Sequence, residues 1–300
     1  MKKIINLVSV LVKLALLSML GLFPASSYGQ QTSFSILSEK AEELGIEESL
    51  ITKLQERANM NRISEQKLAD ILEPAVALAE LNLPFDKLLE KTFEGLAKNI
   101  PDQVLINVLQ RLQKATQQSV VIVDPWLQER SVQEMLERTK TEGSSQQFRN
   151  NMLNSAGRAL SQGIPEETVA NFMNELKSDE ILSQVSTSEM VTSLNILADL
   201  PTSDGNSDIS QKLIIRALKG GFGSSDLQKL PAAMQMAKNK GQLPSSGIAN
   251  GVFEQIQAGS PAAEILQGLF EGKIGGGPPA GVPGRPENLP GRGNSGNGQQ

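Results

Sequence analysis

The chain contains no cysteine and no histidine among its 300 residues. Without a thiol or an imidazole it has no Ser-His-Asp or Cys-His nucleophile system, no thiolate or histidine zinc ligand and no imidazole proton shuttle. A single tryptophan and a single tyrosine are too few for the stacked rings that sugar-cleaving clefts usually offer their substrates. The composition therefore excludes the commonest classes of catalytic site.

Carboxylates are the chemistry that remains, because cleavage of a glycosidic bond needs only a pair of Asp or Glu side chains. Glu94 and Glu271, each followed by glycine, are the most motif-like acids. Solvated helix faces explain both more simply. We predict that the protein is not an enzyme and has no catalytic residue, no cofactor and no metal ion, and we keep a carboxylate-dependent hydrolase as the alternative.

One segment resembles the start of a calcium-binding loop. It runs from Asp204 to Asp208 and has oxygen-bearing side chains at alternate positions. Ile209 stands where such a loop needs glycine, and Ile215 stands where it needs a bidentate glutamate. A turn followed by a helix N-cap at Asp208 is the simpler interpretation.

The N-terminus has the three parts of an export signal. Lys2 and Lys3 precede an apolar stretch at 14–23, and Pro24 is followed by the small residues of 25–29. We predict a signal peptide at 1–29, cleaved after Ser27 or Gly29, and a periplasmic or secreted protein. The alternative, a permanent anchor, would hold Lys13 near the middle of the bilayer at a cost of roughly 2.5–3.5 kcal/mol.

Removal of this segment makes the chain more acidic. It takes away three lysines and no acid, so the net charge falls from −5 to −8. An acidic surface disfavours nucleic acids and anionic lipids. We expect the mature chain to bind no nucleic acid and to have no membrane span.

A short pattern recurs nine times between residues 45 and 265. A residue that can end a helix is followed by an apolar residue, then by proline or a small or capping residue, with another apolar residue four positions further on. The third residues of these boxes are 47, 64, 84, 101, 165, 186, 223, 244 and 261. Glycine or asparagine suits the left-handed backbone that closes a helix, and proline suits the first turn of the next one. Apolar residues after each box follow a period of 3.6 residues, so the pattern predicts helices joined by tight junctions.

The spacing of the boxes suggests a two-helix repeat. Residues 47 to 84, 64 to 101 and 186 to 223 are separated by 37 positions, and 223 to 261 by 38. We therefore predict an all-α array of helical hairpins of about 37 residues over 30–274, with an irregular all-α globular domain as the alternative. If it is a repeat, Ile100 and Ile164 occupy equivalent places, and we expect both to be buried.

The register is lost between about Ala115 and Asn154. The β-branched run at 120–123 favours a strand locally, yet no partner strand follows, so a buried helix end or a bridging loop is the better interpretation. The body is then either one unit or two lobes, 30–118 and 150–274. From 275 to 300 glycine and proline dominate, and we expect a disordered tail.

The stretch from Leu88 to Pro101, which contains Glu94-Gly95-Leu96-Ala97-Lys98-Asn99-Ile100-Pro101, resembles a known motif. It is similar to the Glu-Gly-Leu-Ala-Lys-Gly-Val-Pro (EGLAKGVP) box of bacterial exported helical proteins that often end in a Gly/Pro-rich tail and have no known activity. Asn99 replaces the usual glycine. The close match covers about 20 residues, and looser copies occur at Gly163-Ile164-Pro165 and Glu271-Gly272-Lys273. The resemblance implies a helical fold and an envelope or secreted setting, and no activity.

Taken together, these observations favour an exported α-helical binding or scaffold protein of the cell envelope whose partner is a protein or another envelope component. The alternative is a carboxylate-dependent hydrolase that acts on envelope glycan.

Overall fold

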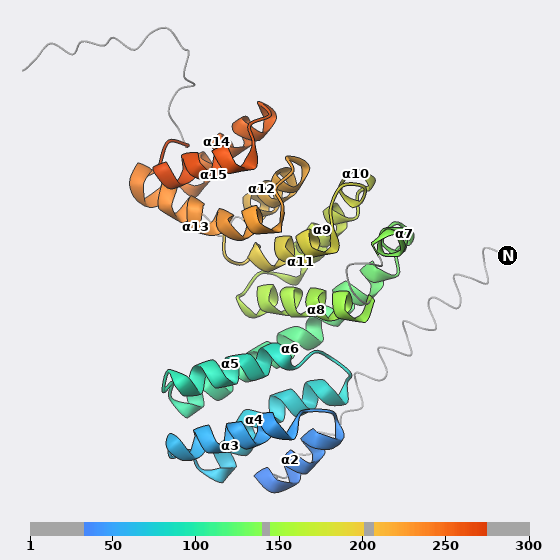
Figure 1. Cartoon of the computed structure of the whole chain (residues 1–300), viewed down its shortest axis with the longest axis vertical. Helices are drawn as coiled ribbons and strands as arrows, with labels where there is room; N and C mark the ends of the chain where they lie inside the picture. Colours follow the sequence, from blue (N-terminus) through green and yellow to red (C-terminus); the bar gives the residue numbers. More distant parts are fainter. Residues whose placement is uncertain (1–32, 140–144, 201–206, 275–300) are drawn as a thin grey trace, which may run out of the picture.

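The computed structural model describes residues 33–139, 145–200 and 207–274, and these residues form fourteen α-helices and no strand (Figure 1). The helices are α2 (Phe34–Glu43), α3 (Glu48–Met60), α4 (Glu65–Glu80), α5 (Asp86–Ala97), α6 (Asp102–Leu127), α7 (Arg130–Arg138), α8 (Ser145–Ser161), α9 (Glu166–Leu176), α10 (Asp179–Leu182), α11 (Thr187–Ile196), α12 (Ser207–Lys219), α13 (Ser224–Gly241), α14 (Ser245–Gln257) and α15 (Ala262–Glu271). The all-α prediction is confirmed.

Every predicted junction lies between two helices. At eight of the nine boxes the third residue is the N-cap of the following helix, namely Glu47, Ser64, Pro101, Pro165, Ser186, Gly223, Pro244 and Pro261. At the ninth box the N-cap is Phe85, one residue after Pro84. Proline thus stands at or just before the N-cap and not inside the first turn, where its missing N–H also costs no intrahelical hydrogen bond.

The first residue of a box takes the left-handed conformation at eight of the nine junctions: Gly45, Arg62, Asn82, Asn99, Gly163, Gly221, Gln242 and Gly259. The chain then closes the helix with paired hydrogen bonds. At the end of α8, for example, Gly163 N–H donates to the Leu160 carbonyl over 3.0 Å, and Ile164 N–H donates to the Ala159 carbonyl over 3.1 Å. These bonds satisfy carbonyls that would otherwise lack partners at the helix end.

The helices stack so that alternate elements pack on one another. One row runs through α2, α4, α6, α8, α11, α13 and α15, each in contact with the next. On its other side α3 packs on α5, α9 on α12, and α12 on α14. One apolar core follows the rows from Phe34 to Leu269. The result is an elongated, curved stack in which α2 and α15 lie near opposite ends (Figure 1).

A regular repeat of 37 residues is not confirmed. The helices differ greatly in length, since α6 has 26 residues and α10 has four. The stretch where the register was lost belongs largely to α6 and α8. Residues 120–123 lie in the last two turns of α6, with Ile122 and Val123 buried, in agreement with the buried helix end that the sequence favours over a sheet.

The expectation that Ile100 and Ile164 are both buried is wrong for Ile100. Its side chain is 37% exposed, whereas Ile164 is partly buried against the core. The hydrogen bond that closes the helix is present at both places, with Ile100 N–H donating to the Gly95 carbonyl. The two junctions therefore share their backbone geometry, but their isoleucine side chains are not buried to the same extent. Burial of a junction side chain depends on the helices that pack around it.

The predicted signal peptide at 1–29 and the tail at 275–300 lie outside the described residues. Among the helices that are described, none is both long and apolar enough to cross a membrane.

Candidate functional site

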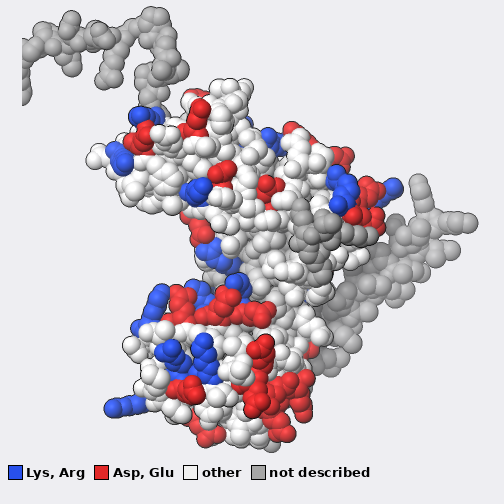
Figure 2. Space-filling model, in the orientation of Figure 1, with Lys and Arg blue, Asp and Glu red and all other residues white. Residues whose placement is uncertain are grey.

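A groove of about 920 Å³ opens between α5 and α6 on one side and α8 and α11 on the other. Figure 2 shows an indentation on the left side of the molecule, with charged side chains of both signs along its lower wall. The volume lies within the ~300–1,000 Å³ range that is usual for ligand sites. This groove is the candidate functional site.

The floor of the groove lies where α6 and α8 meet. Thr116 of α6 and Ser155 of α8 line it, and both are buried. Gly157 of α8 brings the two backbones together, because a Cβ at this position would stand 3.0 Å from the Thr116 Cα. Beside it Ser119 Oγ donates a hydrogen bond to the Leu153 carbonyl over 3.1 Å.

A second polar contact fastens the same two helices toward the end of α6. Arg149 of α8 binds Asp124 of α6 through two parallel hydrogen bonds, 2.8 Å from Nε and 2.9 Å from Nη2. The carboxylate raises the pKa of Arg149 through these hydrogen bonds. A bidentate pair fixes orientation as well as distance, so this pair holds α6 and α8 together beyond the residues that line the groove.

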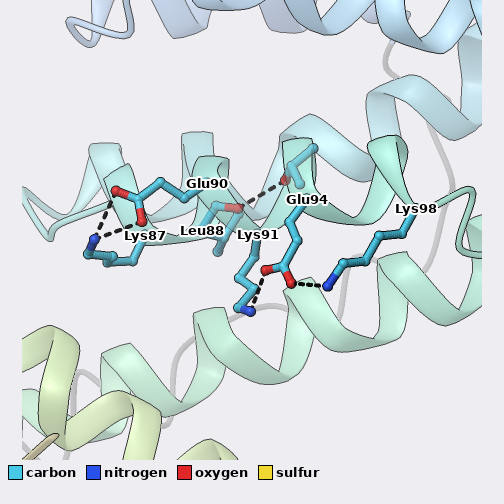
Figure 3. Close-up of polar contacts among 7 residues, drawn as sticks. Lys87, Leu88, Glu90, Lys91, Glu94 and Lys98 are labelled. Carbon is cyan, nitrogen blue, oxygen red and sulfur yellow. Dashed lines mark hydrogen bonds and ion pairs between the residues drawn. The ribbon is translucent and has the colours of Figure 1, made fainter. Parts of the chain in front are cut away.

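The α5 wall presents a row of charged side chains (Figure 3). Lys87 pairs with Glu90, with its Nζ 2.7 Å from Oε2. Glu94 accepts from two lysines at once, Lys91 at 2.5 Å and Lys98 at 2.6 Å. These hydrogen bonds, first from Lys91 and then from Lys98, lower the pKa of Glu94 to about 2. The Lys91–Glu94–Lys98 cluster therefore carries one net positive charge.

The acids singled out from the sequence are not brought together. Glu94 lies on α5, and Glu271 ends α15 near the far end of the stack (Figure 1). The pKa of Glu271 is also lowered, by hydrogen bonds from Lys273 and then Gln267. A general acid for glycoside cleavage needs a raised pKa, and both carboxyl groups are shifted in the opposite direction.

The α6 wall combines an apolar stripe with a cation. Val108 and Leu112, one turn apart, line the groove and are partly buried. Val104 continues the stripe by one more turn and is 50% exposed. Arg111 lines the groove beside them, and no residue in the described part of the chain pairs with its exposed guanidinium.

The opposite wall is rich in amides. Asn151 and Asn154 of α8 lie three positions apart and line the groove. Neither side-chain amide has a hydrogen-bond partner among the described residues. Arg158, also of α8, is fully engaged. Its Nη1 donates to the Asn195 carbonyl at 2.7 Å and its Nη2 to Asp199 Oδ1 at 2.6 Å. The groove thus has a free cation on one wall and free amides on the other.

The calcium-like segment falls partly outside the described residues, which resume at Ser207. Asp208 lies inside the first turn of α12, so the prediction of an N-cap at Asp208 is wrong. Nowhere in 33–139, 145–200 or 207–274 do three or more Asp or Glu side chains gather in a way that could hold a metal ion.

Sequence reasoning missed Arg111, Asn151 and Asn154, the groove residues whose side chains have no partner among the described residues. Each is an ordinary polar residue on a helix face, and only the stacking of α6 against α8 brings them together. The signal that could have found this meeting point is Gly157, a glycine within a helix, where it marks a close approach of two backbones.

No family model, no curated protein and no solved structure matches this chain.

Proposed function

We propose that this protein is an exported α-helical binding or scaffold protein of the cell envelope and that it binds its partner in the groove between α5–α6 and α8–α11. The observation that carries the proposal is the groove itself, a concave site of about 920 Å³ lined by unpaired polar side chains. The side chains of Arg111 and Asn151 can form hydrogen bonds with water in the free protein. A partner that displaces this water can form hydrogen bonds with them in its place.

Export is supported by the N-terminal pattern of lysines, an apolar stretch and small residues in 1–29. The similarity of 88–101 to a box in exported helical proteins supports the same setting. N-terminal sequencing of protein recovered from the periplasm or the medium should begin at Tyr28 or Gln30. Recovery only as a full-length chain embedded in the membrane would contradict export.

A hydrolase acting on envelope glycan has less support. Two acids line the groove, Glu90 and Glu94, and each is held by lysine in an ion pair. One of a pair of catalytic carboxyl groups must stay protonated as the acid, whereas Lys91 and Lys98 lower the pKa of Glu94.

Site-specific crosslinking tests the binding role. A photoreactive amino acid would replace Asn151 in the groove, and in a second variant it would replace Arg57, an exposed residue of α3 that does not line the groove. In cells that produce the full chain, we expect a defined adduct from position 151 and none from position 57. The same adducts from both positions, or none from position 151, would contradict the proposal.

A further inference from the structure

We propose that the groove binds an extended, acidic segment of a partner polypeptide. This inference rests on the proposed binding function and specifies the chemistry of the partner. Three features carry it: the balance of charge in the groove, the free amides of α8 and the apolar stripe of α6.

The groove is cationic on an acidic protein. Lys87 is paired with Glu90 and Arg158 with Asp199, so the positive charge comes from the Lys91–Glu94–Lys98 cluster and from Arg111. The whole chain, in contrast, has a net charge of −5. Arg111 is free to form a new ion pair. A cationic site set in an acidic surface attracts acidic partners and disfavours basic ones.

The amides suit the backbone of an extended chain. An asparagine side chain offers both a donor and an acceptor, which is what one peptide unit of a strand needs. Residues three apart on a helix have Cβ atoms roughly 5–6 Å apart, and alternate residues of a strand repeat every 6.4–6.8 Å or so. Asn151 and Asn154 can therefore hold two successive outward-facing peptide units. A helical partner would have no free peptide groups to offer them.

The opposite wall suits alternating side chains. In a strand successive side chains point to opposite sides, so one set can contact Val108 and Leu112 in the groove while the other carries the carboxylates. Val104 extends this apolar surface by one turn beyond the groove lining. Arg111 lies beside this stripe and can bind a carboxylate through two parallel hydrogen bonds. The composition favoured is thus one of aliphatic and acidic residues.

An anionic polysaccharide would satisfy the charge but not the rest of the site. None of the described residues that line the groove is aromatic, so there is no ring on which a sugar could stack. The apolar contact comes from branched aliphatic side chains, which match aliphatic side chains of a peptide better than the hydroxyl-covered faces of an acidic sugar.

Fluorescence anisotropy with the mature chain tests the proposal. The probes are a labelled short peptide of Glu, Val and Gly and a matched peptide with Lys in place of Glu. We expect the acidic peptide to bind and the basic one not to bind, with affinity that falls as salt is raised. Arg111→Glu replaces the one unpaired cation among the described groove residues by an anion that repels the peptide, and it should raise Kd roughly tenfold to a hundredfold.

Two further variants separate the site from general charge. Asn151→Ala combined with Asn154→Ala should weaken binding without changing its dependence on salt, since these side chains are neutral. Arg57→Glu changes the net charge as much as Arg111→Glu but lies outside the groove, and it should leave Kd nearly unchanged. Circular dichroism should be used to check that each variant is folded, and Arg111→Gln would repeat the test with a smaller change in charge.

The proposal is overturned if the basic peptide binds as well as the acidic one, if Arg111→Glu and Arg57→Glu weaken binding equally, or if a polyuronic acid binds the groove and neither peptide does. Absence of peptide binding, together with a defined crosslink from position 151 in cells, would overturn the acidic peptide and leave the binding function standing. Absence of both would overturn the two proposals together.

Discussion

Gly163 adopts φ +91° where α8 ends, and apart from its two chain neighbours no described residue has an atom within 4 Å of the place where its Cβ would stand. Gly163→Ala therefore tests backbone conformation without steric contact. A left-handed residue with a Cβ costs 1–2 kcal/mol, offset in part by the lower entropy of the unfolded chain, so we expect a loss of about 1 kcal/mol of stability in urea unfolding.

The matched control for Gly163→Ala is Gly247→Ala. Gly247 lies within α14, its φ is not left-handed, and a Cβ there would make ordinary contact with Pro244 at 3.7 Å. Alanine should stabilise this helix by roughly 0.5–1 kcal/mol. Substitutions of the same kind at the two positions should therefore shift stability in opposite directions, and a shift of the same sign would show that the left-handed conformation has no energetic weight.

Glu94 carries a testable dependence on pH. Its folded pKa of about 2 lies below the ordinary value, so its contribution to stability is present above the ordinary pKa and is lost as the pH falls through about 2. NMR titration of the Glu94 carboxyl carbon should show a midpoint well below 4.5, the ordinary value for a glutamate. Lys91→Met should raise the midpoint because it removes the hydrogen bond that lowers the pKa of Glu94 most. High salt should also raise it, because these side chains are exposed and salt screens their charges. A midpoint near 4.5 in the wild-type chain would rule out the lysine cluster.

At the level of helices, the packing of α6 on α8 depends on Gly157. Alanine usually favours a helix over glycine, yet a Cβ here would lie 3.0 Å from both the Cα and the Oγ1 of Thr116. Because the Thr116 backbone belongs to the packed α6, we expect Gly157→Ala to destabilise the protein despite its better helix propensity. Thermal unfolding should show a lower Tm for Gly157→Ala and a higher one for Gly247→Ala. A gain of stability at Gly157 would mean that α6 can give by the few tenths of an ångström that the new Cβ needs.

Sequence alone predicted the helix junctions well because their causes are local. A left-handed residue, an apolar residue and a cap act within a few positions of one another, and the boxes at Gly45 and Gly163 show this directly. The starts of α2, α7, α8, α10 and α12 carry no such box, and the boxes could not place them. The ends of α2, α8, α10 and α12 do lie at boxes, those that begin at Gly45, Gly163, Gln184 and Gly221.

At the scale of the whole molecule, the stack predicts how damage spreads. Ile164→Ala removes partly buried apolar surface at the α8–α9 junction and should cost up to roughly 2–5 kcal/mol, whereas Ile100→Ala should cost less because its side chain is 37% exposed. If each helix depends mainly on its neighbours, hydrogen exchange should quicken near the α8–α9 junction and stay slow in α2–α4. Equal acceleration throughout the described residues would indicate one cooperative core and would exclude a repeat array.

The groove could not have been predicted from the sequence, for a reason that belongs to this same scale. Its walls come from residues as distant in the chain as Leu78 of α4 and Asn195 of α11. These residues line one groove because of how the helices between them pack on one another. Arg111 of α6 and Asn154 of α8 likewise line the same groove only because their helices are in contact.

The contact of α6 with α8 at Gly157 also ties the width of the groove to a single position. Gly157 lies on α8 between Asn154 and Arg158, which both line the groove, and a Cβ there would stand 3.0 Å from the Thr116 Cα. An added methyl group would therefore move α8 away from α6 by a few tenths of an ångström. The width of the groove can thus be changed in small steps from a residue that does not itself line it.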